Sequence, residues 1–142
     1  MRRKARDIKE VTPEIKKLAE DMIETMVNVK PEGLGLAGPQ VGISKNIFVA
    51  QTTDGPRIFI NPEIIKKSKE TETMEEGCLS LPGVWLNIKR AKAAELEYLD
   101  AEGKISKIKA EGLFARILQH EIDHLKGILI IDKVNFWQKL TK

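Results

Sequence analysis

This sequence is poor in several features, and each scarcity excludes a class of protein. Its single cysteine, Cys78, excludes an internal disulfide and suits a reducing compartment. No apolar run reaches the roughly 18 residues that a membrane-spanning helix needs. The basic start at residues 2–4 is followed by Asp7, Lys9 and Glu10 instead of the apolar segment of a secretory signal. We therefore expect a cytoplasmic protein without membrane contact.

The charge is also unremarkable, with 24 basic and 21 acidic residues and a formal net charge of +3. Lysines are spread along the chain and often stand beside acids, which indicates a solvated surface rather than a specific nucleic-acid partner. A weak attraction to ribosomal RNA is compatible with this charge. The 142 residues, 42% of them apolar, suit one core. With no internal repeat or linker, residues 1–142 should form a single domain.

The two histidines of the chain, His120 and His124, stand four residues apart with Glu121 beside the first. On a helix this spacing places them roughly 40° apart, on one face. Two imidazoles so placed can hold one metal ion, and Glu121 is close enough to act as a base on a water molecule that the metal activates. The alternative is a helix that carries two histidines without binding metal.

The third metal ligand does not lie downstream, where common zinc proteases have it. Gly127 fits the His-x-x-Gly-x-x-His pattern, but Ile130 occupies the ligand position. No glutamate follows Glu121, and Asp132 stands at the wrong spacing. The ligand should therefore come from upstream, where Cys78 is the one thiol. A thiolate and two imidazoles leave a fourth position open, as catalytic sites require.

Three motifs in fixed order now make the chain resemble the peptide deformylase family. Residues 33–40 read Gly-Leu-Gly-Leu-Ala-Gly-Pro-Gln, residues 76–80 read Glu-Gly-Cys-Leu-Ser, and residues 119–124 read Gln-His-Glu-Ile-Asp-His. Within these motifs, only Gly38 differs from the family pattern, which usually has alanine at this position. The resemblance extends from about Arg2 to Val134 and is far more specific than a lone His-Glu-x-x-His.

The resemblance implies a metal-dependent hydrolase that removes the N-formyl group from the formylmethionine of nascent polypeptides and releases formate. It implies one divalent metal ion per chain, Fe(II) in the cell, with zinc, nickel or cobalt accepted by the purified protein. Glu121 would be the general base, while Gln40 and the backbone N–H of Leu79 would stabilise the oxyanion. The implied metal ligands are Cys78, His120 and His124.

The family resemblance also implies that the substrate backbone pairs like a strand with Leu34, Gly35 and Gly77. Leu113 and Ile117 share the metal-facing side of the motif helix, where an apolar pocket would suit a methionine side chain. Alternatively, these two residues merely fill the core.

Two other functions stay open at this point. A catalytically silent relative would bind peptide N-termini or metal without turnover, and an ordinary zinc peptidase is disfavoured by the missing downstream ligand. Trp85 stands where some family members have an arginine that contacts the peptide. Neither the family's further N-terminal strand nor the long basic C-terminal helix of some members is recognisable, so we expect at most weak association with the ribosome.

The remaining pattern predicts an α+β fold. Thr12-Pro13-Glu14 starts an amphipathic N-terminal helix. The resemblance implies antiparallel β-sheets wrapped around a central helix that carries the His-Glu-x-x-His motif, over residues 112–126. On that helix Arg116, Gln119 and Asp123 form a polar strip, with Glu76 and Arg90 as candidate partners of its charges. Strands are expected at 47–49, 58–60, 64–65, 94–98, 105–108 and 128–131.

The segments between these elements carry expectations as well. The glycine-rich residues 33–42 should let backbone approach a substrate, because no strand leads into them as a phosphate-binding loop would require. Asn61-Pro62 should end or kink a strand, and the polar residues 66–75 should lie on the surface. Pro82-Gly83 should form a turn.

Overall fold

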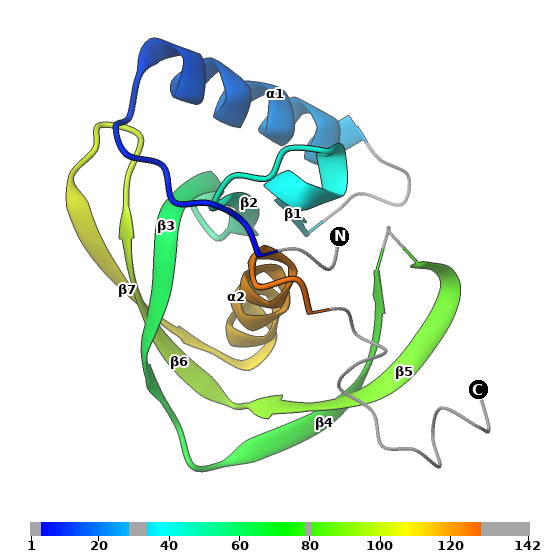
Figure 1. Ribbon diagram of the computed structural model, residues 1–142. Coiled ribbons are helices and arrows are strands. Elements are labelled where there is room, and N and C mark those ends of the chain that lie inside the picture. Colours follow the sequence, from blue (N-terminus) through cyan, green and yellow to red (C-terminus); the bar gives the residue numbers. More distant parts are fainter. Residues whose placement is uncertain (1–3, 29–33, 79–80, 129–142) are drawn as a thin grey trace.

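The computed structural model describes residues 4–28, 34–78 and 81–128, with the backbone alone for residues 78, 81, 82 and 84. These residues form a five-stranded antiparallel sheet in the order β1-β2-β3-β6-β7, a two-stranded antiparallel sheet of β4 and β5, and two α-helices (Figure 1). The predicted α+β fold and its N-terminal helix are thereby confirmed. The elements are α1 (Pro13–Asn28), β1 (Gly35–Ala37), a 3₁₀ turn (Gly38–Val41), β2 (Ile47–Thr52), β3 (Gly55–Lys67), β4 (Thr71–Cys78), β5 (Leu81–Ala91), β6 (Ala93–Leu99), β7 (Ile105–Glu111) and α2 (Gly112–Leu125).

The large sheet is covered on both faces, because its central strands are apolar at successive positions. Side chains alternate between the two faces of a strand. From β2, Phe48 and Ala50 join an apolar cluster with α2, while Ile47 and Val49 join a second cluster with α1. The two helices thus lie on opposite faces, with α2 at the centre of the molecule (Figure 1).

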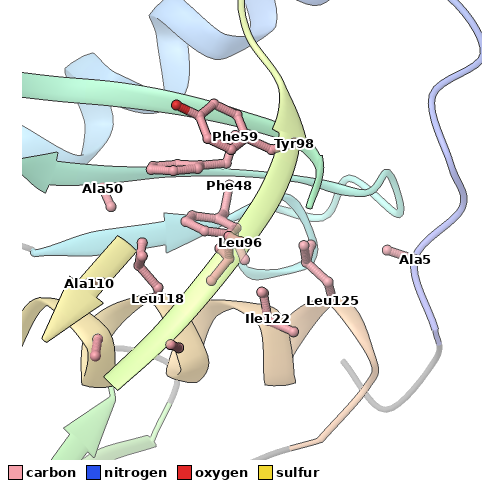
Figure 2. Packing of buried hydrophobic residues seen from close by; sticks show 13 residues of the cluster. Ala5, Phe48, Ala50, Phe59, Leu96, Tyr98, Ala110, Leu118, Ile122 and Leu125 are labelled. Atoms are coloured by element: carbon pink, nitrogen blue, oxygen red, sulfur yellow. The ribbon is translucent and has the colours of Figure 1, made fainter. Parts of the chain in front are cut away.

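The apolar cluster that includes residues of α2 contains three aromatic rings in contact with one another, one pair stacked and one pair tilted. The ring centroids of Phe48 and Phe59 are 4.6 Å apart, as are those of Phe59 and Tyr98. Leu118 and Ile122 of α2 pack onto this cluster (Figure 2). These contacts fix one side of α2, so the opposite side is free to carry chemistry.

Helix α1 confirms its predicted start and apolar stripe. The Ile15 backbone N–H donates to Thr12 Oγ1 over 3.3 Å, as an N-cap requires. Along the helix Ile15, Ala19, Met22 and Met26 are buried. No helix of the described residues is both long and apolar enough to cross a membrane.

The glycine-rich region differs from expectation, because a short strand, β1, leads into the 3₁₀ turn. Pairing of Gly35 with Ala50 and of Ala37 with Phe48 makes β1 an edge of the large sheet. At Gly38 an added Cβ would lie 2.8 Å from the carbonyl oxygen of Ile43, so backbone packing leaves no room for the alanine that the family usually has.

Other strand boundaries were predicted with mixed success. The kink at Asn61 is confirmed, with φ of +48° and a register shift in the pairing with β6. Residues 66–75 are largely exposed, as expected, although most of them are strand. The predicted turn at Pro82-Gly83 is wrong, since both lie in β5. Of the strand predicted at 128–131, residue 128 is not in a strand and the rest lies outside the described residues.

Candidate active site

Helix α2 separates its apolar and chemical residues onto different sides. Ala115, Leu118, Ile122 and Leu125 are buried in the cluster with the large sheet. His124, which is 1% exposed, and His120, whose side chain is 13% exposed, point away from that cluster. The packing of α2 on the large sheet therefore fixes the helix that carries both imidazoles.

The two imidazoles converge as metal ligands do. His120 Nε2 and His124 Nε2 lie 3.1 Å apart, and the rings meet edge to face. Glu76 Oε1 lies 3.0 Å from His120 Nδ1, so a carboxylate that only accepts assigns the hydrogen to Nδ1 and leaves the lone pair on Nε2. Two nitrogens on one tetrahedral zinc ion would be roughly 3.3 Å apart, given bonds of about 2.0–2.1 Å. The donor pair therefore fits a metal ion.

Glu76, which contacts the His120 ring, is itself bound by two arginines. Arg90 donates to both of its carboxylate oxygens, over 2.6 Å and 2.9 Å, and Arg116 donates to Oε2. Burial raises the pKa of Glu76, but hydrogen bonds from His120 and Arg90 and the charge of Arg90 outweigh it and lower the pKa to about 2. The carboxylate is therefore ionised, which keeps it an acceptor for His120.

Glu121 lies against the backbone of β1. A Cβ built on Gly35 would lie 2.6 Å from Glu121 Oε2 and 2.9 Å from its Cγ, so only glycine permits this approach. Glu121 is 4% exposed. Its carboxylate is thus confined between α2 and the edge strand, one residue along the chain from His120, a predicted metal ligand.

Gln40 is oriented by the turn that carries it. The backbone N–H of Ala37 donates to Gln40 Oε1 over 2.9 Å. This contact assigns the oxygen of the amide, so the Nε2 end is the donor that faces away from Ala37. The 3₁₀ turn therefore presents an amide donor next to β1.

The residues expected to meet a peptide lie on two strand edges. Leu34, 48% exposed, precedes β1, and Gly77 lies near the end of β4. The indole carbons of Trp85 come within 2.8–3.0 Å of where a Gly77 Cβ would stand, yet Trp85 is 56% exposed. The indole thus covers Gly77 while offering an aromatic face to solvent.

The two predicted pocket residues of α2 behave differently. Leu113 is 54% exposed and so does not fill the core. Ile117 is half-buried and packs against the cluster with the large sheet. The core interpretation therefore applies in part to Ile117 and not to Leu113.

Two predicted site residues cannot be placed. Leu79 and the side chain of Cys78 lie outside the described residues, although the backbone of Cys78 ends β4 and pairs with Leu81. The part of the chain that is described contains no group of three or more His, Cys, Asp or Glu side chains arranged to hold a metal ion. It does contain two of the three predicted ligands, His120 and His124, with their Nε2 atoms 3.1 Å apart.

The sequence predicted the ion pairs of this region but not the contact of Glu76 with His120. The suggested partners of Arg116 and Asp123 are confirmed, because Arg116 binds Glu76 and Arg90 Nη1 lies 2.7 Å from Asp123. The bond from Glu76 to His120 and the packing of Trp85 on Gly77 were not anticipated. The sequence feature that could have predicted the contact between Glu76 and His120 is the glutamate two residues before Cys78.

Comparison with known proteins gives a consistent result. The sequence profile of the polypeptide deformylase family matches residues 1–140. A peptide deformylase of Prochlorococcus marinus (strain NATL1A) is 47% identical over 147 residues, covering 100% of this chain and 72% of that protein. Peptide deformylase 1 of Clostridium perfringens is 52% identical, covering 93% of this chain and 89% of its own length.

Solved structures agree in fold as well as in sequence. The crystal structure of peptide deformylase from Thermotoga maritima has a TM-score of 0.89 and 44% identity, covering 94% of this chain and 90% of that one. A peptide deformylase from Synechococcus elongatus, crystallised in complex with actinonin, has a TM-score of 0.91 and 38% identity, covering 99% and 76%. With its motifs, its paired histidines and these similarities along most of its length, the chain belongs to the peptide deformylase family.

Proposed function

We propose that this chain removes the N-formyl group from the formylmethionine of nascent polypeptides and releases formate. As a peptide deformylase it is a divalent-metal enzyme that acts on formylated nascent peptides. The observation that carries the proposal is the 3.1 Å approach of the two histidine Nε2 atoms, with His120 Nδ1 held by Glu76. That arrangement brings a nitrogen of each ring within reach of one ion, and Glu121 follows His120 in the sequence.

The metal centre would be formed by Cys78, His120 and His124, with one divalent ion per chain. Fe(II) is the ion we propose for the cell, and the same ligands accept zinc, nickel or cobalt in purified protein. When bound, the ion supplies a Lewis acid that lowers the pKa of a water molecule toward neutrality. Replacing Cys78 with alanine should remove metal and activity together.

The chain's own residues would carry the proton and the developing charge. Glu121 would accept a proton from the attacking water and return it to the leaving amine, so one carboxyl is base and then acid. The substrate oxyanion would receive hydrogen bonds from Gln40 Nε2 and from the Leu79 N–H. Loss of one such donor typically costs about 10²–10³ in rate.

The peptide would bind between the two sheets. Its backbone would pair with Leu34 and Gly35 at the edge of β1 and with Gly77 of β4, in the manner of an added strand. The exposed Leu113, with the neighbouring Ile117, would offer the apolar surface for the methionine side chain. We also infer that residues 1–142 form one catalytic domain that works in the cytoplasm and contacts the ribosome weakly.

The test is to incubate the metal-loaded protein with formyl-Met-Ala-Ser and, separately, with unblocked peptides. Formate release without peptide cleavage is the expected result. Peptide cleavage would instead indicate a zinc peptidase, and metal binding with neither product would indicate a silent relative.

A further inference from the structure

The two-stranded sheet is joined to α2 by a set of polar contacts. Both apolar clusters draw their described members from α1, α2, the large sheet and the N-terminal segment, and none comes from β4 or β5. Leu86 and Ile88 of β5 are buried but lie outside both clusters. Hydrogen bonds and ion pairs nevertheless join β4 and β5, the strands of the sheet that carries Cys78, to α2.

These polar contacts follow one strip of α2. Gln119 exchanges hydrogen bonds with the backbone N–H and C=O of Ala91, over 3.3 Å and 2.9 Å. Asp123 accepts from Arg90 of β5 over 2.7 Å. Arg116, His120 and Asp123 are three or four residues apart, so they share a side of the helix with Gln119. The strip faces β4 and β5 along about two turns of α2.

Arg116 connects α2 to both strands of the small sheet. Its Nη1 donates to the Glu76 carboxylate and, over 2.9 Å, to the carbonyl oxygen of Ile88. Its Nη2 donates over 2.5 Å to the carbonyl oxygen of Glu72. One planar guanidinium thus joins α2 to two positions of β4 and one of β5, and its side chain is 7% exposed.

Glu76, the carboxylate that Arg116 binds, also contacts His120, one of the proposed metal ligands. Glu76 receives Arg116 on one carboxylate oxygen and His120 on the other. Cys78 follows Glu76 by two residues, which is about 7 Å of extended chain. The contacts that fix the position of Glu76 relative to α2 therefore also affect the distance from Cys78 to the two histidines.

We propose that Arg116 is a positioning residue of the metal centre: through Glu76 and the carbonyls of Glu72 and Ile88, it holds the β4–β5 sheet at the separation from α2 at which Cys78, His120 and His124 share one ion. This inference rests on the proposed function for the identity of the ligands. It assigns Arg116 no contact with substrate or metal. Its effect is on how tightly and in what geometry the ion is held.

The experiment compares three variants of the full-length chain loaded with Co(II). Arg116→Met keeps the bulk of the side chain and removes every donor, whereas Arg116→Lys keeps one charged donor group that cannot reach all three acceptors. Gln119→Met is the matched control, because it breaks a buried α2–β5 contact without touching Glu76. The readouts are the rate of cobalt release to a chelator, the ligand-field spectrum of the bound ion, and the melting temperature.

We expect cobalt release to accelerate about 10–100-fold in Arg116→Met, with an altered spectrum and an intermediate rate in Arg116→Lys. Gln119→Met should lower the melting temperature but keep the wild-type spectrum and release within threefold. Wild-type release from Arg116→Met, or equal acceleration in Gln119→Met, would overturn the inference. If Arg116→Met does not fold, the Arg116→Lys rate decides in the same way.

Failure of the proposed function gives a different pattern. A wild-type chain that binds no Co(II) would refute the metal centre itself and this inference with it. A wild-type chain that binds Co(II) with a sulfur-to-metal absorption band, but whose Arg116 variants match it, would refute the inference alone.

Discussion

Replacing Gly35 with alanine should misplace Glu121, the proposed general base, without removing it. The added Cβ would lie 2.6 Å from Glu121 Oε2, whereas ordinary contact begins near 3.4 Å, so the carboxylate must shift by about 0.8 Å. Glu121 is 4% exposed and has little room to swing aside. A misplacement of about 1 Å can cost about 10²-fold in rate. We therefore expect kcat for formate release to fall about 10²-fold.

Stability should change little in the same variant. Gly35 does not have a positive φ, and alanine in a strand is favoured over glycine by about 0.5–1 kcal/mol, which offsets part of the local clash. Metal content should stay near one ion per chain. Gly55→Ala is the matched control: nothing lies within 4 Å of its Cβ position, but its φ is +105°. It should lose about 1–3 kcal/mol of stability and keep wild-type kcat.

The assay is steady-state formate release from formyl-Met-Ala-Ser, with metal analysis and thermal unfolding on the same preparations. A Gly35→Ala enzyme with kcat within threefold of wild type would refute the reasoning. Either the Glu121 carboxylate would not then be confined against β1, or its position would not matter to the reaction.

Three further changes have expected outcomes. Glu121→Gln should retain one metal ion and lose about 10³–10⁴ in rate, because one residue serves as base and acid; nearly full formate release would contradict that role. Trp85→Ala should change the relative kcat/KM for formyl-Met-Phe-Ser and formyl-Met-Ala-Ser and leave formyl-Met alone unaffected; an unchanged ratio would remove Trp85 from the peptide site. Phe59→Ala should lower the free energy of unfolding by about 3–5 kcal/mol in denaturant titration, since its buried ring stacks on Phe48 and contacts Tyr98 at a tilt; a loss below about 1 kcal/mol would contradict that packing.

The sequence predicted the helices and the large sheet because their buried residues are apolar and periodic. The stripe of α1 repeats at helical spacing, and Ala94, Leu96 and Tyr98 alternate on β6 as a half-buried strand should. Helix α2 was predicted equally well, since its histidines and its polar strip stand at helical spacing.

The two-stranded sheet was the part that the sequence concealed. In β4 the buried side chain among those described is Glu76, and in β5 the alternation includes Arg90. Charged residues at buried positions, Glu76 in β4 and Arg90 in β5, interrupt the apolar pattern of these strands, so a search for hydrophobic periodicity detects them poorly. The bond from Glu76 to His120, and with it the tautomer of His120, became visible only in three dimensions.

The central claim is that one metal ion joins α2 to the β4–β5 sheet through two histidines and the cysteine. X-ray absorption on the zinc-loaded chain measures this ligand set directly. The claim predicts one sulfur at about 2.3 Å and two imidazole nitrogens at about 2.0–2.1 Å. A zinc shell with no sulfur, in protein that retains reduced Cys78 and releases formate, would contradict it.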